Sequence, residues 1–502
     1  MLKAPLILVV LISCTSALFG QNTQTYSFTI KPEKTHQIIH NFGASDAWSI
    51  QYFGKNWPAE KRNQAADYLF STEVDEDGNP LGIGLTLWRF NIGGGTAELG
   101  EKSEIPLLWR RAESFIDENG NYDWSKQAGQ QWFMNAAMER GVDQFVAFSN
   151  TPPVHFTLNG KGFSEPGDHA NLKPDAYDDF AEFLATVALH FDSLGMPFDY
   201  ISPVNEPQWN WDNNKQEGSS WRNEQIYKLV NHLNEALVAN GSDTKIEIPE
   251  AARQIDLYSA GGIKNRDRQL YRFFDPASEY YIGDLKHVAL KVAAHSYFTT
   301  YPPENLIEVR DSLRIHIDQL NPDIEFWMSE YCLLEDNEEV KGPGRDLGID
   351  PALYLAKVIH HDLVYAQSNS WQWWLGVSPF NYKDGLVYIT DNITDGDVYD
   401  SKMLWALGNY SRFVRPGMHM IEVEGEAPGI YLSAFKGNGE IIVVAINENK
   451  VEQKIGLKGI SGSVKKYVTA AGDQFDLKYV GEFERSDSVN LTSRSVTTFV
   501  IK

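Results

Sequence analysis

The segment that decides the fold reads PDAYDDFAEFLATVALHFDSLG at 174–195 and YISPVNEP at 200–207. In the first part, Tyr177, Phe180 and Ala181 begin an apolar series with the i, i+3, i+4 spacing of a helix that has one buried face. The second part is a short apolar run that ends in polar residues, as buried parallel strands do. A helix followed directly by such a strand predicts a repeating β/α architecture.

The same alternation extends in both directions, over residues 40–414. Short apolar runs that predict strands lie at 40–47, 86–92, 144–149, 200–204, 245–248, 290–295, 325–328 and 370–374. Helix-like spacing fills 59–70, 124–140, 223–239, 304–320, 350–367 and 403–414. Eight strands interleaved with helices predict an α/β fold, a (β/α)8 TIM barrel with long loops. A doubly wound open sheet is the alternative that this pattern leaves open.

The pattern changes after residue 414, and residues 415–502 are predicted to form an appended β-sandwich. Strand-like runs lie at 429–435, 440–446, 464–469 and 495–501. The sequence KGNG at 436–439 is typical of a hairpin turn. A strand-like run within residues 21–39 precedes the barrel and is expected to pair into the same sandwich.

Residues 1–20 have the pattern of a secretory signal peptide, so export to the periplasm, the cell surface or the medium is expected. Lys3 supplies a positive charge, residues 6–12 are apolar, and small residues follow. The sequence LISC at 11–14 also resembles a lipoprotein box, in which Cys14 would carry the lipid. Cleavage near residue 20 would leave Cys332 as the single cysteine, so no intramolecular disulfide is expected.

The charge balance argues against a nucleic-acid partner. The 502 residues include 44 Lys and Arg against 68 Asp and Glu, a formal charge of −24, and phosphate groups would repel such a chain. No run after the signal approaches 18 apolar residues, so a lipid on Cys14 is the one membrane contact expected. The 14 Trp, 23 Tyr and 26 Phe suit either a large core or stacking on sugar rings.

Candidate catalytic residues lie at two predicted strand ends, because TIM barrels carry their functional groups at the carboxyl ends of the strands. The fourth strand ends in Asn205-Glu206-Pro207 and the seventh in Ser329-Glu330-Tyr331. Two facing carboxylates are what glycoside hydrolysis requires, one to protonate the leaving oxygen and one to attack the anomeric carbon. We therefore expect Glu206 and Glu330 to be catalytic.

Three motifs resemble glycoside hydrolase family 30: ISPVNEP at 201–207, WMSEY at 327–331 and SRFVRPG at 411–417. The resemblance covers nearly the whole chain after the signal, including the sandwich. It implies a retaining β-glycosidase that works by double displacement, with Glu206 as acid/base and Glu330 as nucleophile. No cofactor and no metal is expected.

Further motifs look most like the endo-β-1,6-galactanase branch of that family: WRFNIGGG at 88–95, SNTPP at 149–153, and PQWNW with QEG at 207–218. The implied substrate is β-1,6-linked galactan, such as arabinogalactan side chains. Val154-His155-Phe156 departs from the branch pattern, so that wall of the site is expected to differ. Alternatives are the same chemistry on β-1,6-glucan, xylan or another β-glycoside, and a non-catalytic glycan-binding protein.

Polar residues at the strand ends are expected to support the two glutamates. Asn205 should hydrogen-bond the sugar 2-hydroxyl, and Arg89 should hold Glu330 ionised, although a purely structural ion pair is the alternative. His295 or Tyr297 could bond Glu330. Asp46 is the candidate for gripping the terminal hydroxyls of the sugar, and Asn150 completes the polar set.

Aromatic residues are expected to hold the sugar rings. Trp373 is predicted to form the platform beneath the sugar that is attacked, with a core tryptophan as the alternative. Trp209, together with Trp211, could stack on leaving-side sugars, and Trp48 ends the first strand near the same face.

Other signals indicate no further chemistry. The glycines at 93–95 lack the GxGxxG spacing of a dinucleotide site. His360-His361 has no HExxH neighbour, so a core or solvated pair is expected rather than a metal site. No GxSxG elbow occurs, which disfavours an α/β-hydrolase.

Overall fold

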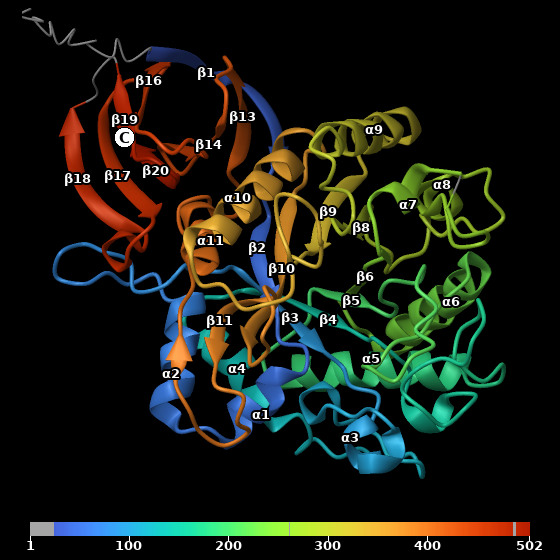
Figure 1. Cartoon of the computed structure of the whole chain (residues 1–502). Coiled ribbons are helices and arrows are strands. Elements are labelled where there is room, and N and C mark those ends of the chain that lie inside the picture. The colour runs from blue at the N-terminus through green and yellow to red at the C-terminus, as the bar shows by residue number, and fades with distance from the viewer. Residues whose placement is uncertain (1–24, 261, 485–487) are drawn as a thin grey trace, which may run out of the picture.

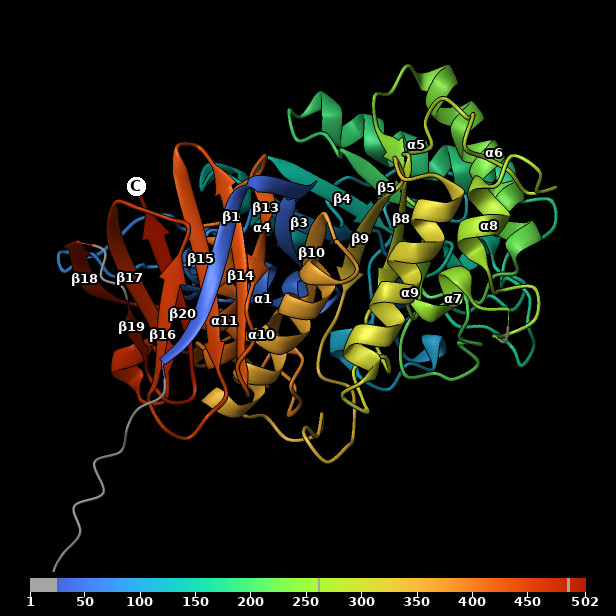
Figure 2. The ribbon, with the colours of Figure 1, turned by 90° about the horizontal axis from the view of Figure 1, so that it is seen from above.

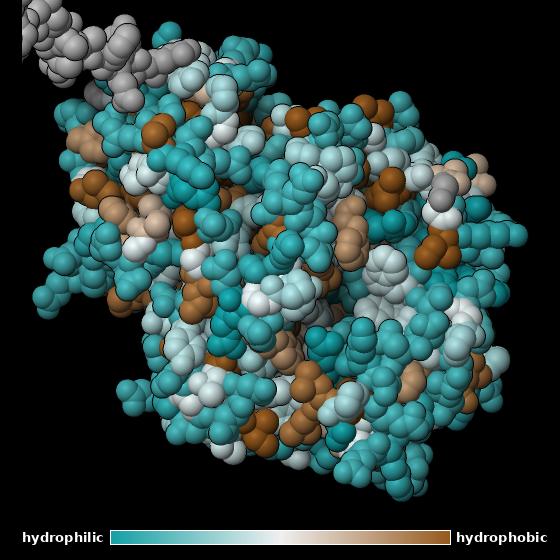
Figure 3. Space-filling model, viewed as in Figure 1, coloured by the Kyte–Doolittle hydropathy of each residue, from teal (hydrophilic) through white to brown (hydrophobic). Residues whose placement is uncertain are grey.

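The computed structural model describes residues 25–260, 262–484 and 488–502. It consists of a barrel surrounded by helices and a β-sheet domain beside it (Figures 1 and 2). The predicted signal peptide at 1–20, with Cys14, lies outside the described residues. Within the described residues, no helix combines the length and the apolar character needed to cross a membrane. The face shown in Figure 3 is mostly hydrophilic, with apolar residues scattered singly.

The barrel strands follow one another in chain order and pair in parallel. They are β2 (Asn41–Ser45), β3 (Leu87–Asn91), β4 (Gln144–Phe148), β5 (Tyr200–Ser202), β6 (Lys245–Ile246) with β7 (Pro249–Ala251), β8 (Lys291–His295), β9 (Glu325–Glu330) and β10 (Ser370–Ser378). The last strand, β10, pairs with the first, β2. The fifth barrel strand is interrupted, because β6 pairs with β5 whereas β7 pairs with β8. This closure confirms the (β/α)8 barrel and excludes the open doubly wound sheet.

Helices cover the outside of the barrel. They are α1 (Ser49–Asn56), α2 (Ala59–Phe70), α3 (Thr96–Leu99), α4 (Ala128–Glu139), α5 (Tyr177–Ser193), α6 (Asn223–Asn240), α7 (Ile255–Tyr258), α8 (Gln269–Phe274), α9 (Asn305–Leu320), α10 (Ile349–Val364) and α11 (Lys402–Ser411). Helix α5 shows how the sequence pattern acts, since Phe180, Leu184 and Phe191 are fully buried along its inner face. Gly195, with φ of 74°, lets the chain turn just after this helix.

The β-domain combines the start of the described chain with its end. Its strands are β1 (Thr25–Ile38), β13 (His419–Glu424), β14 (Ile430–Gly437), β15 (Glu440–Asn447), β16 (Gln453–Lys458), β17 (Ser463–Ala470), β18 (Lys478–Glu484), β19 (Val489–Leu491) and β20 (Ser495–Ile501). Strand β1 is antiparallel to β13 and parallel to β16. Asn438 and Gly439 both have positive φ in the turn between β14 and β15, as tight hairpin turns require.

The sheet of the β-domain buries both of its faces. Phe28, Val443 and Phe499 belong to an apolar core within the domain. Phe435 and Val444 face the other way and are part of the large core shared with the barrel helices. The two parts of the molecule are therefore held together by a continuous apolar core.

The motif at 411–417 lies at this junction. The Arg412 guanidinium donates to the carbonyl oxygens of Ser71 and Gly82 at 3.1 and 3.0 Å. Arg415 donates to the carbonyl oxygens of Gly84 and Ser411 at 2.5 and 2.9 Å. These arginines connect the end of α11 to the loop between α2 and β3, so this motif has a structural role.

Candidate active site

A pocket of about 600 Å³ opens beside the carboxyl ends of the barrel strands. It is lined by Arg110, Asn205, Glu206, Trp209, Trp211, Gln216, Tyr297, Phe298, Glu330, Cys332, Leu334, Trp374, Phe380, Asn381, Tyr382 and Asp384. Asn205, Glu206, Trp209, Tyr297 and Glu330 were predicted to be site residues, and the structure brings them together here. A charged, aromatic-lined pocket at this end of a barrel is the usual place for an active site.

Glu330, the last residue of β9, is held by two donors. Arg89 Nη1 donates to Glu330 Oε2 at 2.5 Å, and the Tyr297 hydroxyl donates to Oε1 at 3.0 Å. The carboxylate is only 3% exposed. A buried carboxylate that accepts from a guanidinium and a hydroxyl has a fixed orientation.

Glu206 follows β5 and faces the same pocket. Its backbone N–H donates to the Glu250 carbonyl at 2.9 Å, and its Oε1 accepts from His295 Nδ1 at 3.1 Å. Burial raises the pKa of Glu206, the His295 ring opposes that effect, and the negative charge of nearby Glu330 adds to it. The resulting pKa is raised, so this carboxyl holds a proton more readily than an exposed glutamate.

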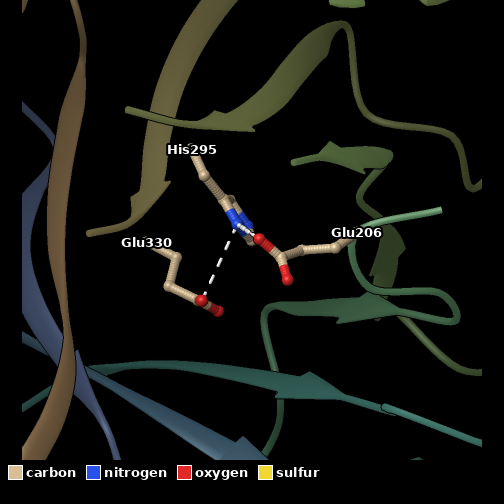
Figure 4. Close-up of side chains that lie close together, drawn as sticks. All are labelled: Glu206, His295 and Glu330. Carbon is tan, nitrogen blue, oxygen red and sulfur yellow. Dashed lines mark hydrogen bonds and ion pairs between the residues drawn. The ribbon is translucent and has the colours of Figure 1, made fainter. Parts of the chain in front are cut away.

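His295, at the end of β8, lies between the two glutamates (Figure 4). Its Nδ1 is 3.1 Å from Glu206 Oε1 and 3.7 Å from Glu330 Oε1, and its Nε2 is 3.0 Å from Glu250 Oε2. Burial by itself lowers the pKa of His295, but Glu330, Glu206 and Glu250 outweigh it and raise the pKa to about 10. The raised pKa favours the imidazolium form, which donates from both nitrogens, to Glu206 Oε1 and to Glu250 Oε2.

Glu206, His295 and Glu330 also have the residue types and spacing of a metal site, with one potential ligand atom from each within 4.8 Å of the others. A metal would have to displace the proton of His295, whose pKa is about 10. It would also compete with Arg89, which already pairs with Glu330. The raised pKa of His295 and the ion pair of Glu330 with Arg89 both oppose metal binding at these three residues.

Glu250, on β7, belongs to the same charged group, although the sequence did not single it out as a site residue. It is fully buried and accepts hydrogen bonds from Ser202 Oγ at 2.9 Å, Ser329 Oγ at 2.5 Å and the His295 ring. Burial raises its pKa, but Arg89 and His295 outweigh burial, so the net effect lowers the pKa. The lowered pKa favours the ionised form of Glu250, which lies behind His295.

Arg89 connects Glu330 to an amide chain. Its Nη2 donates to Asn205 Oδ1 at 2.9 Å, and Asn205 Nδ2 donates to Asn150 Oδ1 at 3.1 Å. Asn150 Nδ2 in turn donates to Asn91 Oδ1 at 3.0 Å. Arg89, Asn150 and Asn91 lie behind the pocket and position Asn205, which lines it.

Four non-glycine residues at or next to the pocket have a left-handed backbone: Glu206, Trp211, Glu250 and Phe298, with φ between 45° and 56°. Such conformations are costly for residues that carry a Cβ and tend to occur at functional sites. The surrounding hydrogen bonds and packing must therefore hold these residues in place.

The loop after Glu206 forms an aromatic wall. Trp209 and Trp211 line the pocket, and Trp211 Nε1 donates to the Glu206 carbonyl at 3.1 Å. Trp209 lies edge-on to Phe298, with ring centroids 6.1 Å apart. Phe298 is 52% exposed, so this wall presents aromatic surface to solvent.

The predicted platform, Trp373, is placed differently. It is fully buried, its Nε1 donates to the Asp384 carbonyl at 2.7 Å, and its ring stacks on Trp371 at 6.3 Å. The next residue, Trp374, lines the pocket. The pairing of β10 with β2 is irregular between Trp373 and Leu375, and simple strand alternation does not hold there. The aromatic wall at this strand is therefore Trp374, which corrects the prediction.

Asp46 and Trp48 do not line the pocket. Asp46 is fully buried, and its carboxylate accepts from the Asn91 N–H at 2.8 Å and from Gln130 Nε2 at 3.0 Å. Burial, only partly opposed by these hydrogen bonds, raises the pKa of Asp46 to about 7. Trp48 is 1% exposed and packs edge-on against Trp374 at 5.4 Å. Both residues support the pocket from behind.

The segments singled out at 93–95, 149–153 and 216–218 meet beside the pocket. Glu217 is fully buried and accepts from the Gly94 N–H at 3.0 Å and from Thr96 Oγ1 at 2.6 Å. A Cβ on Gly94 would lie 2.5 Å from Thr151 Cγ2, which explains why glycine occupies this position. The glycine run therefore serves close packing between loops.

A protein-family model for O-glycosyl hydrolase family 30 matches residues 25–388, which is most of the chain. The chain belongs to glycoside hydrolase family 30. The family assignment agrees with the resemblance found in the sequence, and it makes this protein a glycoside hydrolase by family. Family 30 membership also agrees with the closed barrel and the attached β-domain.

Three relatives show how similar other proteins are. A glucuronoxylanase, XynC, from Bacillus subtilis is 24% identical over 420 residues, covering 77% of this chain and 79% of its own. An endo-β-1,6-galactanase from Hypocrea rufa is 21% identical over 458 residues, covering 88% and 85%. The crystal structure of a conserved exported protein from Bacteroides fragilis is 38% identical with a TM-score of 0.89, and the match covers 95% of this chain and 100% of that one.

Proposed function

We propose that this family 30 protein is a retaining endo-glycosidase that cleaves β-1,6-linked galactan by double displacement. One observation carries the retaining mechanism: oxygens of Glu206 and Glu330 lie within 4.8 Å of each other. Retaining enzymes hold their two carboxyl groups about 5–5.5 Å apart, whereas inverting enzymes leave about 6.5–9.5 Å for a water molecule. The spacing favours direct attack by a carboxylate.

In the first step Glu330 attacks the anomeric carbon and Glu206 protonates the departing oxygen. Arg89 and Tyr297 aim the Glu330 carboxylate. The raised pKa of Glu206, caused by burial and opposed by His295, keeps a proton available for the leaving group. The bond from C1 to the leaving oxygen breaks as the ester bond to Glu330 forms.

In the second step Glu206 acts as a base. Ester formation removes the negative charge of Glu330, and with it one of the effects that raise the pKa of Glu206. Glu206 then takes a proton from a water molecule, whose oxygen attacks C1. Glu330 leaves as a carboxylate, and the sugar retains its β-configuration.

The remaining pocket residues are assigned to substrate binding. Asn205 has its Oδ1 occupied by Arg89 and one amide hydrogen by Asn150, so its other amide hydrogen is available for the sugar 2-hydroxyl. Trp374 is proposed as the wall against the attacked sugar. Trp209 and Trp211, which follow Glu206, are proposed to stack on leaving-side sugars.

Galactan is supported by motifs and by one relative. Of the three segments that resemble the galactanase branch, 207–218 lines this pocket, and 88–95 and 149–153 reach it through the hydrogen bonds of Arg89 and Asn150 with Asn205. A relative covering most of the chain bears the name endo-β-1,6-galactanase. Export is proposed from the signal at 1–20 and from the description of the Bacteroides fragilis relative as exported. A lipid on Cys14 is the alternative form of this proposal, because cleavage near residue 20 would remove Cys14.

The test is to incubate the protein with arabinose-stripped β-1,6-galactan, β-1,6-glucan and glucuronoxylan, and to follow product sizes over time. A ladder of short oligosaccharides from galactan is expected. Products from glucan or xylan alone would agree with the two-glutamate mechanism but would contradict galactan as the substrate. If no substrate is cleaved but galactan still binds, the non-catalytic glycan-binding alternative is favoured.

A further inference from the structure

One wall of the pocket carries two charged residues with no assigned role. Arg110 ends a short 3-10 helix (Leu108–Arg110) in the loop after β3, and Asp384 lies between β10 and β11 (Gly385–Ile389). Both residues line the pocket. They face the same space as Glu330 and Trp374.

Arg110 uses little of its hydrogen-bonding capacity. Its guanidinium lies over the rings of Phe380 and Trp48, at 5.2 and 6.0 Å, and Nη1 donates to Gln216 Oε1 at 3.4 Å. Its Nε is buried without an acceptor. Among the residues that the structure describes, Arg110 makes no ion pair with a carboxylate, so it is a partly buried cation with donors to spare.

Asp384 is a carboxylate in the same situation. It is 5% exposed, and among the described side chains only Ser378 donates to it, at 2.7 Å. Burial raises the pKa of Asp384 to about 6, although Ser378 and Arg110 oppose that effect. At neutral pH it is therefore mostly an anion with acceptor capacity left over.

The loop that carries Asp384 is held rigidly from outside the pocket. Arg345 Nη2 donates to the carbonyl oxygens of Pro379 and Ile389, at 3.1 and 3.0 Å. Lys383 Nζ donates to the carbonyl oxygens of Lys341 and Gly344, at 2.7 and 2.8 Å. The position of Asp384 is therefore set before any ligand binds, which lowers the ordering cost of binding.

This wall adjoins Glu330. The Tyr297 hydroxyl is 3.0 Å from Glu330 Oε1 and 3.7 Å from Cys332 Sγ, and Asp384 is close enough to Cys332 to help burial raise the pKa of that thiol. Tyr297 and Cys332 thus connect Glu330 with the neighbourhood of Asp384 inside the pocket that all four residues line.

We propose that Arg110 and Asp384 form a clamp for the C3 and C4 hydroxyls of the attacked sugar, an inference that rests on the glycosidase function proposed above. In a β-1,6-linked chain the C6 oxygen of that sugar carries the preceding residue and C1 faces Glu330. The 2-hydroxyl is assigned to Asn205, which leaves the hydroxyls at C3 and C4. A guanidinium can donate to one hydroxyl oxygen while the carboxylate accepts from the other.

The clamp suits a neutral sugar. Arg110 and Asp384 carry opposite charges within one wall, so a neutral diol leaves that balance unchanged, whereas a sugar carboxylate would add a negative charge that the pair does not balance. Galactose and glucose differ only in the orientation of the C4 hydroxyl. A fixed carboxylate and guanidinium at that position would therefore distinguish the two sugars.

The test uses nitrophenyl β-1,6-galactobiosides in which the galactose next to the nitrophenyl group is intact, 2-deoxy, 3-deoxy or 4-deoxy. On the intact substrate, Asp384→Asn and Arg110→Gln should each lower kcat/KM by about 10- to 100-fold, the effect of losing a hydrogen bond to a charged group. Each substitution should cost little further activity on the one substrate, 3-deoxy or 4-deoxy, that lacks the hydroxyl bound by the substituted residue, and should keep its effect on the other. On the 2-deoxy substrate their full effect should persist.

Asp395→Asn is the matched control, because it makes the same chemical change at an exposed carboxylate paired with Lys61. Arg110→Lys separates charge from geometry, and thermal unfolding of each variant checks the fold. Equal losses on all four substrates would overturn the clamp. The corresponding nitrophenyl β-1,6-glucobiosides, intact and deoxy, are assayed in parallel. If the wild-type protein cleaves only these glucosides, the galactan assignment fails, and the effects of the two substitutions on the intact and deoxy glucosides then test the clamp. Cleavage of neither series overturns both proposals.

Discussion

Two buried histidine sites in this molecule behave in opposite ways. His295 lies at the barrel mouth between Glu206 and Glu250, and the carboxylates around it raise its pKa to about 10 against the effect of burial. His361 lies on α10 beside the β-domain, stacks on Tyr365 at 5.4 Å, and has its pKa lowered by burial to about 4. Burial disfavours the charged form in both cases. The charge of the neighbouring side chains decides whether each imidazole ring is favoured in its charged or its neutral form.

The same contrast extends to the two regions. At the barrel mouth, Arg89, His295 and three glutamates keep charges in the interior and hold them by mutual pairing. At the junction of α10 with the β-domain, His360 Nδ1 lies 2.8 Å from Ser433 Oγ, and burial lowers the pKa of His360 well below its usual range. At the barrel mouth the buried histidine is held by carboxylates, whereas at the junction the two buried histidines have no carboxylate partner among the described residues, although Lys357 on the same helix pairs with Glu339 and Glu448.

The largest expected effect comes from removing the charge of Glu330. Glu330→Gln should lower kcat on the cleaved glycan by on the order of 10⁴-fold, because the proposed nucleophile is lost while the side-chain shape is kept. Initial rates measure this, and binding of an oligosaccharide to the variant should persist. Normal turnover by the variant would contradict the assignment of the nucleophile.

The second effect separates the acid from the nucleophile. Glu206→Gln should lower kcat by roughly 10²- to 10⁴-fold on substrates with poor leaving groups, and much less on nitrophenyl glycosides, which need no protonation. In wild-type protein, activity should fall as the pH rises through the raised pKa of Glu206. A pH–rate profile of the variant that kept this alkaline decline would assign it to another group.

The third prediction tests the contrast between the histidines through stability. The folded-state pKa of His295 lies above its unfolded value, so its contribution is present below about pH 6.5 and is lost as pH rises towards 10. The folded-state pKa of His361 lies below its unfolded value, so its contribution is present above about pH 6.5 and is lost as pH falls towards 4.

Denaturant unfolding measured across pH should therefore respond differently in two variants. His295→Gln should flatten the alkaline side of the stability curve, and His361→Phe should flatten the acidic side while keeping the ring stack. The slope attributable to one group is at most about 1.4 kcal/mol per pH unit. Parallel changes in the two variants would mean that neighbouring charge does not distinguish the sites.

The smallest effect is expected at the junction. Ser433→Ala removes the hydroxyl partner of His360 and should lower the free energy of unfolding by about 1 kcal/mol, the net value of one buried hydrogen bond. Thermal or chemical denaturation measures it, and kcat on the cleaved glycan should be unchanged. A loss of activity without a loss of stability would connect this region to the site.

Much of the fold could be predicted because periodicity reports burial directly. The apolar face of α5 and the short apolar runs that form the barrel strands are both local patterns, the first from burial of one side and the second from burial of both. Glu206 and Glu330 could be found because parallel strands of a barrel end at one rim, so that residues distant in the chain meet there. The hydrophobic pattern could not place Trp373 and Trp374, since the pairing of β10 is irregular at that point.

The sequence by itself determined the barrel, the β-domain and the two glutamates, because hydrophobic spacing and strand-end position depend on neighbours along the chain. Only the tertiary structure decided the protonation of His295 and the role of Glu250, since their partners come from β3, β5, β8 and β9. It also decided that Arg110 and Asp384 share one wall of the pocket. Electrostatic interactions depend on distance in space, and folding sets those distances between residues far apart in the chain.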